Sequence, residues 1–144
     1  MTVSKRRRAL PHLRRDGATY FVTWRLDRNQ PLLGKGDRHT VFGMLRRYEP
    51  LHWRLNAAVV MDDHVHVIVT PAPGRSITLI VQAWKATSSS ALRQFGRAAP
   101  IWQRGYHDRI VRPSEFEQTI RYVASNPRTR WPALVDYPWL FVES

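Results

Sequence analysis

Two histidines, two residues apart, open a run of β-branched residues in the segment His64-Val65-His66-Val67-Ile68-Val69. Successive side chains of a strand point to opposite faces, so His64 and His66 share one face. Two neutral imidazoles on one face can hold a divalent metal ion and leave other coordination positions open for a substrate. The same spacing also fits a strand with two polar residues on a solvated face, and the rest of the chain must decide between the two interpretations.

A second pair of residues suited to chemistry is Tyr122 and Asn126, which lie four apart and therefore on the same face of a helix. A tyrosine hydroxyl, with a pKa of about 10, attacks phosphorus only when it is held in line with a polarised phosphate. A metal held by His64, His66 and the amide oxygen of Asn126 would polarise it, provided that the helix packs across the histidine face. Alternatively, Tyr122 is a core aromatic and Asn126 caps the helix before Pro127.

The strands that must position the histidines follow from β-branched and aromatic runs bounded by turn residues. We predict a first strand over residues 19–26, a second over 52–60 and a third that begins at His64. The short connection 61–63 makes the second and third strands a hairpin. A fourth strand is expected over 106–112.

Three helices are expected from apolar residues at helical spacing and from capping residues. They begin at the caps Asp37, Ser76 and Ser114 and end before Pro50, near Phe95 and at Asn126-Pro127. The order βαββαβ followed by a helix predicts an α+β fold, a ferredoxin-like antiparallel sheet with helices on one face and an added C-terminal helix. Residues 1–16 are expected to form a basic arm, poorly ordered until it meets phosphate, and residues 17–144 a single domain.

The chain is strongly basic, with 23 Lys and Arg against 11 Asp and Glu and a net charge of +12. All but three of the 23 are arginine, the cation that binds phosphate with two parallel hydrogen bonds and stacks on bases. This balance favours a polyanionic partner, and nucleic acid above a membrane surface. A GC-rich genome is the alternative, which would explain arginine over lysine but not the net charge.

Several function classes are excluded by what the sequence lacks. It has no cysteine, which excludes disulfides, zinc–thiolate clusters and thiol nucleophiles and fits a reducing cytoplasm. Its apolar stretches are far shorter than the roughly 20 residues that cross a bilayer. No apolar segment follows the basic start, so it does not resemble a secretory signal. We therefore expect a soluble, cytoplasmic and nucleoid-associated protein with no membrane partner.

Basic residues in the arm and near the predicted loops are the candidates for DNA contact. They are Lys5, Arg6, Arg7, Arg8, Arg14, Arg15, Lys85, Arg104, Arg128 and Arg130. A solvated position is the alternative for Lys85. Of the tryptophans, Trp24 and Trp84 are expected in the core, whereas Trp102 and Trp131 follow loops and are expected to be available for base stacking.

Three blocks in this order carry a family resemblance: 60–66 (VMDDHVH), 102–109 (WQRGYHDR) and 122–127 (YVASNP). The chain resembles the REP-associated tyrosine transposases, relatives of the IS200-like single-strand transposases, over about residues 19–139. The resemblance implies the HUH nuclease fold and cleavage and rejoining of single-stranded DNA through a 5′-phosphotyrosine intermediate. It also implies Mg²⁺ or Mn²⁺ as the cofactor.

Carried over residue by residue, the resemblance makes His64 and His66 metal ligands, Tyr122 the nucleophile and Asn126 the third ligand. It implies single-stranded DNA with hairpin-forming or palindromic repeats as the substrate. The chain is expected to be a monomer or a homodimer. Residues 128–131 (RTRW) depart from the small, hydrophobic or glycine-containing turn that typically follows the Asn-Pro in the family. Two other functions remain open: a non-catalytic nucleic-acid-binding protein derived from a transposase, and a replication-initiator or relaxase-type HUH nickase. The latter usually belongs to larger chains.

Overall fold

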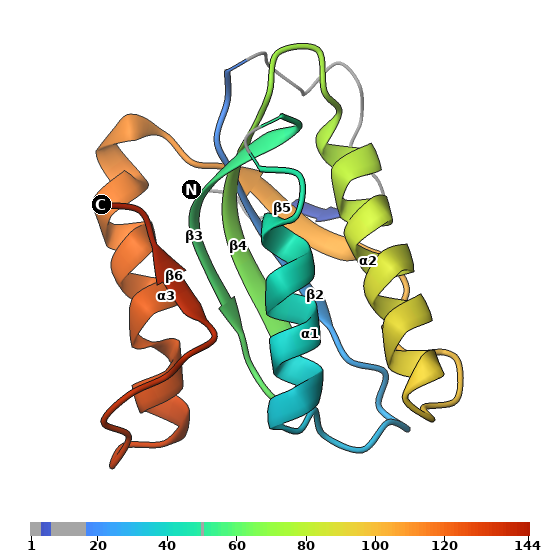
Figure 1. Cartoon of the computed structure of the whole chain (residues 1–144). Helices are drawn as coiled ribbons and strands as arrows, with labels where there is room; N and C mark the ends of the chain where they lie inside the picture. The colour runs from blue at the N-terminus through green and yellow to red at the C-terminus, as the bar shows by residue number, and fades with distance from the viewer. Residues whose placement is uncertain (1–3, 7–16, 50) are drawn as a thin grey trace.

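The computed structural model describes residues 4–6, 17–49 and 51–144, which form a six-stranded antiparallel sheet with helices on both faces (Figure 1). The elements in chain order are β1 (Ser4–Arg6), β2 (Tyr20–Arg25), α1 (Lys35–Arg46), β3 (Trp53–Val60), β4 (His64–Pro71), α2 (Ile77–Gln94), β5 (Tyr106–Ile110), a 3-10 turn (Pro113–Glu115), α3 (Phe116–Arg130) and β6 (Leu140–Val142). The order across the sheet is β1-β5-β2-β4-β3-β6. Its four central strands follow the ferredoxin-like order, which confirms the predicted fold class, while the edge strands β1 and β6 were not predicted.

One face of the sheet carries most of the core. Alternate residues of 20–24 and 65–69 point to this face, where α1 and α2 cover them (Figure 1). Trp24 of β2 stacks on Trp84 of α2 with ring centroids 5.8 Å apart, as expected for core residues. Trp102 is buried against Trp24 as well, so the prediction that it is available for base stacking is wrong. Although Trp102 follows a loop in the sequence, its edge-to-face contact with Trp24 places it in the core.

The opposite face of the sheet is covered by α3 (Figure 1). A smaller cluster of buried residues forms there around Val123 of α3, and its other members are Ala57, Val59, Met61 and Ile68. Because Ile68 lies an even number of residues from His64 and His66, the two histidines point to this face. The prediction that the last helix packs across the histidine face of the sheet is therefore confirmed.

The helix starts agree only in part with the predicted caps. Ser76 caps α2, its hydroxyl accepting a hydrogen bond from the backbone N–H three residues further along the chain. Asp37 lies inside the first turn of α1, where its carboxylate bonds back to the residue before the helix. Ser114 lies in the 3-10 turn, and Glu115 instead accepts the backbone N–H of Arg112 at 3.2 Å. In both cases the predicted helix start is displaced by less than one turn. The reason is that a carboxylate inside the first turn can accept the backbone N–H groups that a cap residue would otherwise satisfy.

The helix α3 continues through Pro127 to Arg130, so the predicted stop at Asn126-Pro127 is wrong. A proline inside a helix removes one backbone hydrogen bond and crowds the preceding turn. Contacts beyond it offset that cost: Arg130 donates to Asp62 at 2.7 Å, and Trp131 stacks on Tyr137 with ring centroids 5.6 Å apart. These contacts hold the last turn of α3 against the hairpin.

The basic arm differs from the expectation at Ser4–Arg6, which pair with β5 as the edge strand β1. Edge pairing needs only backbone groups, so composition gives no sign of it. The remaining predicted arm arginines, at positions 7, 8, 14 and 15, lie outside the described residues. No helix within the described part of the chain is long and apolar enough to span a membrane.

Candidate active site

The β3–β4 hairpin delivers the two histidines to the α3 face. Its connection is fixed from outside, because the carbonyl groups of Asp62 and Asp63 accept hydrogen bonds from the backbone N–H groups of Leu33 and Leu26, each at 2.8 Å. These bonds hold the turn that leads directly into His64. The position of the first histidine is therefore set by the loop between β2 and α1 as well as by the sheet.

His66 is a buried, neutral imidazole. It is 5% exposed, and its Nδ1 lies 2.7 Å from the hydroxyl of Thr23 on β2. Burial, together with the charges of His64 and Arg25, lowers the pKa of His66 to about 3. The ring centroids of His64 and His66 are 4.5 Å apart. Near neutral pH, His66 therefore has a nitrogen lone pair available for a cation.

His64 is oriented by a carboxylate on one side and an amide on the other. Its Nδ1 lies 2.6 Å from Oδ1 of Asp63, so this nitrogen donates to the carboxylate. Its Nε2 lies 3.3 Å from Oδ1 of Asn126. The amide Nδ2 of Asn126 donates to the backbone carbonyl of Tyr122 at 3.0 Å, which turns Oδ1 toward the ring. With the ring neutral, two lone pairs face each other, an arrangement that suits a shared cation.

The donor set fits a divalent metal. Two ligands about 2.1 Å from one ion lie about 3.0 Å apart at a right angle and about 3.4 Å apart in a tetrahedron, close to the 3.3 Å between Nε2 of His64 and Oδ1 of Asn126. The other ring nitrogens are held by Asp63 and Thr23, the outer partners that metal-binding histidines need. No three His, Asp or Glu side chains among the described residues form a group that could hold a metal ion, so a metal site here would need the amide oxygen of Asn126 beside the two imidazoles.

Tyr122 lies beside the histidines and is 54% exposed. Its ring centroid is 5.6 Å from that of His66 and 6.0 Å from that of Phe21, which it meets edge to face. The neighbouring Val123 is fully buried and anchors this turn of α3 to the sheet. The alternative interpretation of Tyr122 as a core aromatic is therefore wrong, because the ring is held by contacts along one side and open to solvent on the other.

Asn126 does not cap the helix, since α3 continues to Arg130. The structure thus brings together all four residues expected to carry chemistry: two from β4 and two from one face of α3, one helical turn apart. Sequence reasoning missed the residues that support them. Thr23 and Arg25 alternate with buried residues of β2 and so share a face, but only the pairing of β2 with β4 reveals which face.

The predicted DNA-contacting residues have different environments. Lys85 is half-buried, which lowers its pKa, and its Nζ donates to the carbonyl oxygens of Gln103 and Gly105 at 2.9 and 2.6 Å. Arg104, between these two residues, is exposed, as is Arg128. Arg130, with a side chain 45% exposed, forms an ion pair with Asp62. Side chains of Lys5 and Arg6 are not among those described.

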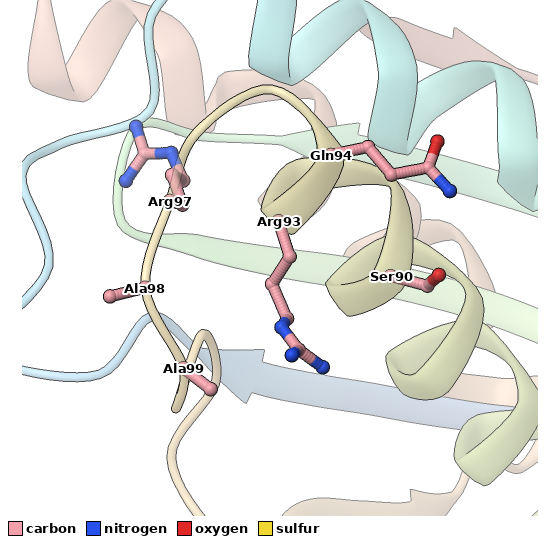
Figure 2. A pocket seen from close by; sticks show the side chains of 6 residues that line it. All are labelled: Ser90, Arg93, Gln94, Arg97, Ala98 and Ala99. Carbon is pink, nitrogen blue, oxygen red and sulfur yellow. The ribbon is translucent and has the colours of Figure 1, made fainter.

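A separate hollow of about 470 Å³ lies at the end of α2, lined by Ser90, Arg93, Gln94, Arg97, Ala98 and Ala99 (Figure 2). The guanidinium of Arg97 is already bound to Asp37 at 2.7 Å and to backbone carbonyls of the β2–α1 loop. Because α2 covers the sheet face opposite to α3, this hollow is separate from the histidines. The four site residues lie on the α3 face, where His66 is buried and Tyr122 is half-exposed.

Comparison with known proteins gives one family. A family model described as "Transposase IS200 like" matches residues 16–126, well over half of the chain and a span that includes all four site residues. No curated protein matches the sequence.

Two solved structures share the fold. The structure of a REP-associated tyrosine transposase bound to a REP hairpin has a TM-score of 0.69 and 22% identity, over 91% of this chain and 82% of that one. A putative transposase from Deinococcus radiodurans R1 has a TM-score of 0.56 and 22% identity, over 74% of this chain and 88% of the other. The predicted HUH fold, a ferredoxin-like sheet with a C-terminal helix, is thereby confirmed.

Proposed function

The chain belongs to the IS200-like transposase family, and we propose that it is a metal-dependent endonuclease and strand transferase for single-stranded DNA. The observation that supports the proposal is the packing of α3 against β4. Tyr122 lies against His66, with ring centroids 5.6 Å apart, and Asn126, one turn further along α3, lies 3.3 Å from His64. A nucleophile and a set of metal donors thus face the same volume.

Tyr122 acts as the nucleophile. Its Oη attacks the scissile phosphorus, the bond from phosphorus to the 3′ oxygen breaks, and the DNA 5′ phosphate is left as a tyrosine ester. The hydroxyl proton passes to solvent and the 3′ oxygen takes up a proton. The ester conserves the energy of the phosphodiester, so attack by a 3′ hydroxyl of another strand reverses the step and rejoins DNA. Half-exposure of Tyr122 allows a nucleic-acid strand to reach it.

His64, His66 and Asn126 are the residues that would hold the metal, with Mg²⁺ or Mn²⁺ as the expected ion. When bound there, it would neutralise charge that develops on the scissile phosphate. Asp63 and Thr23 fix the imidazole rings, and burial keeps His66 neutral, so the chain presents the donors already oriented. Neutral donors leave most of the ion's charge available to the phosphate.

Hairpin-forming repeats are the proposed substrate. The similar REP-associated transposase was solved bound to a REP hairpin. A net charge of +12 and exposed arginines such as Arg104 and Arg128 suit a DNA backbone. A protein that keeps the fold only to bind DNA would have no need for a tyrosine, two histidines and an amide converging on one point.

Covalent capture tests the function and identifies the target sequence in the same experiment. We would incubate the protein and Mn²⁺ with labelled oligonucleotides in which a fixed hairpin is flanked by randomised single-stranded positions, and resolve the products on a denaturing gel. Labelled protein that survives denaturation, with one enriched flank sequence, is the expected result. The same pool annealed to complementary strands is the control. Absence of adduct from the single-stranded pool, with DNA binding intact, contradicts the proposal.

A further inference from the structure

An arginine that the mechanism does not use lies beside the metal donors. Arg25 is the last residue of β2, and it pairs across the sheet with His64, as Thr23 pairs with His66. Since Trp24 between them points into the core on the α1 and α2 side, Thr23 and Arg25 both point to the α3 face. Directly opposed residues have Cβ atoms about 5 Å apart. Arg25 is therefore a neighbour of His64 on the catalytic face.

The guanidinium of Arg25 makes no hydrogen bond or ion pair within the described part of the chain, and the residue is exposed. The carboxylate of Asp63, which directly precedes β4, is bound to His64. The charge of Arg25 also contributes to the lowered pKa of His66, which agrees with its position near the pair. The donors of this guanidinium are therefore available to a ligand.

Such a cation opposes the binding of another cation beside it, because like charges repel. The repulsion is offset when a DNA strand places one phosphate at the metal and the neighbouring phosphate at the guanidinium. Arginine is suited to this role, since its planar fork donates two hydrogen bonds to the oxygens of one phosphate. A position that disfavours metal binding alone favours binding of metal and phosphate together.

The backbone of Arg25 is tied to the 103–105 loop. Gln103 donates its N–H to the carbonyl of Arg25 at 2.8 Å, which ties the 103–105 loop to the end of β2. Lys85 of α2 also holds this loop, because its Nζ donates to the carbonyl groups of Gln103 and Gly105. The residue between them, Arg104, is exposed. The end of β2 that carries Arg25 is therefore held in place by this loop as well as by its pairing with β4.

We infer that Arg25 forms a phosphate subsite that binds the DNA backbone phosphate next to the scissile one. Arg25 lies two residues from Thr23 along β2, about 7 Å from the level of His66 and Tyr122. It is therefore one step away from the reacting phosphorus and not in contact with it. The inference rests on the proposed function for the position of the scissile phosphate, but its binding test does not depend on cleavage.

The first test is the salt dependence of binding to a fluorescent 20-nucleotide oligothymidylate without metal, followed by anisotropy. Arg25→Gln should lower the slope of log affinity against log salt by about 0.7, the value for one lost phosphate contact on a single strand. Arg25→Lys should keep the slope. Arg47→Gln is the matched control, since Arg47 is exposed at the end of α1 on the opposite face. An unchanged slope in Arg25→Gln, with an unchanged melting temperature, overturns the subsite.

The second test identifies which phosphate is bound. Once a cleaved sequence is known from covalent capture, a methylphosphonate is placed at the phosphate next to the cleavage site to remove its charge. Wild-type protein should bind this oligonucleotide several-fold more weakly than the unmodified one, whereas Arg25→Gln should bind both equally. Equal penalties in the two proteins contradict the assignment. If the wild type forms no adduct, the proposed function fails, and the salt slope still decides whether Arg25 binds phosphate.

Discussion

Nε2 of His64 lies 3.3 Å from Oδ1 of Asn126, although the two residues are 62 positions apart in the sequence. This contact joins the start of β4 to the third turn of α3. It also sets the place of Tyr122, which lies one turn earlier on α3 and whose carbonyl holds the amide of Asn126. The distance between the proposed nucleophile and the proposed metal donors is therefore determined by one helix and one strand.

Asn126→Leu should raise the Mn²⁺ concentration required for half-maximal adduct formation by at least about tenfold, because the oxygen donor is removed. Asn126→Asp should retain that requirement or lower it, because a carboxylate oxygen also binds the ion and adds negative charge. Titrating Mn²⁺ against adduct in both variants measures the effect. An unchanged half-saturation in Asn126→Leu would remove Asn126 from the metal site.

Replacement of either histidine should abolish metal-dependent cleavage, but the two should differ in stability. His64→Ala should change the free energy of unfolding by less than about 1 kcal/mol, since the Asp63 carboxylate that loses its partner is 46% exposed and can bind water instead. His66→Ala should cost about 1–3 kcal/mol, because His66 is buried and its loss leaves the Thr23 hydroxyl without its partner. Urea unfolding measures the stability of each variant, and the adduct assay measures its cleavage. His39→Ala, an exposed position on α1, is the control; cleavage at the wild-type rate in either site variant would argue against metal ligation.

The ion pair of Arg130 with Asp62 should stabilise the end of α3. Asp62 has a side chain only 10% exposed, and Oδ2 accepts both Nε and Nη2 of Arg130, at 3.2 and 2.7 Å. Arg130→Gln should therefore destabilise the protein by about 1–3 kcal/mol. Arg128→Gln, two residues away and exposed, should change stability little. Equal stabilities of the two variants would show that the pair contributes nothing, and comparison of their salt slopes for DNA shows whether Arg130 also contacts phosphate.

Much of this architecture was predictable because its signals are local. The alternation around His64 and His66 predicted a strand and a shared face, and the four-residue spacing of Tyr122 and Asn126 predicted a shared helix face. The hairpin followed from its short connection. These patterns depend on backbone geometry alone, so a single sequence carries them.

The errors arose where tertiary contacts override local preference. Pro127 indicated a helix end, but Arg130 and Trp131 hold the helix beyond it. The contact of Lys85 with phosphate stays a prediction, but its hydrogen bonds to loop carbonyls were missed because they depend on residues 18 and 20 positions away. Arg25 was overlooked because only the register between β2 and β4 shows that it faces His64.

The basic arm should contribute to DNA affinity through counterion release. Substituting Arg7, Arg8, Arg14 and Arg15 with glutamine should lower the salt slope for oligothymidylate by about 0.7 for each lost contact. These substitutions leave Ser4–Arg6 in place to pair with β5, so the sheet edge is preserved. Deletion of residues 1–15, by contrast, would remove the arm arginines and the Ser4–Arg6 strand together. If the substituted protein binds with the wild-type slope, the arm does not contact DNA.

The most direct test of the whole account is the covalent adduct formed by Tyr122→Phe with a cleavable single-stranded hairpin in Mn²⁺. Tyr106→Phe is the matched control: it loses the same oxygen atom, but Tyr106 is buried on the opposite face of the sheet, its hydroxyl bonded to Thr78. Tyr122→Phe should bind DNA with nearly wild-type affinity and form no adduct, while wild type and Tyr106→Phe both form it. Adduct formation by Tyr122→Phe at the wild-type level would contradict the assignment of the nucleophile.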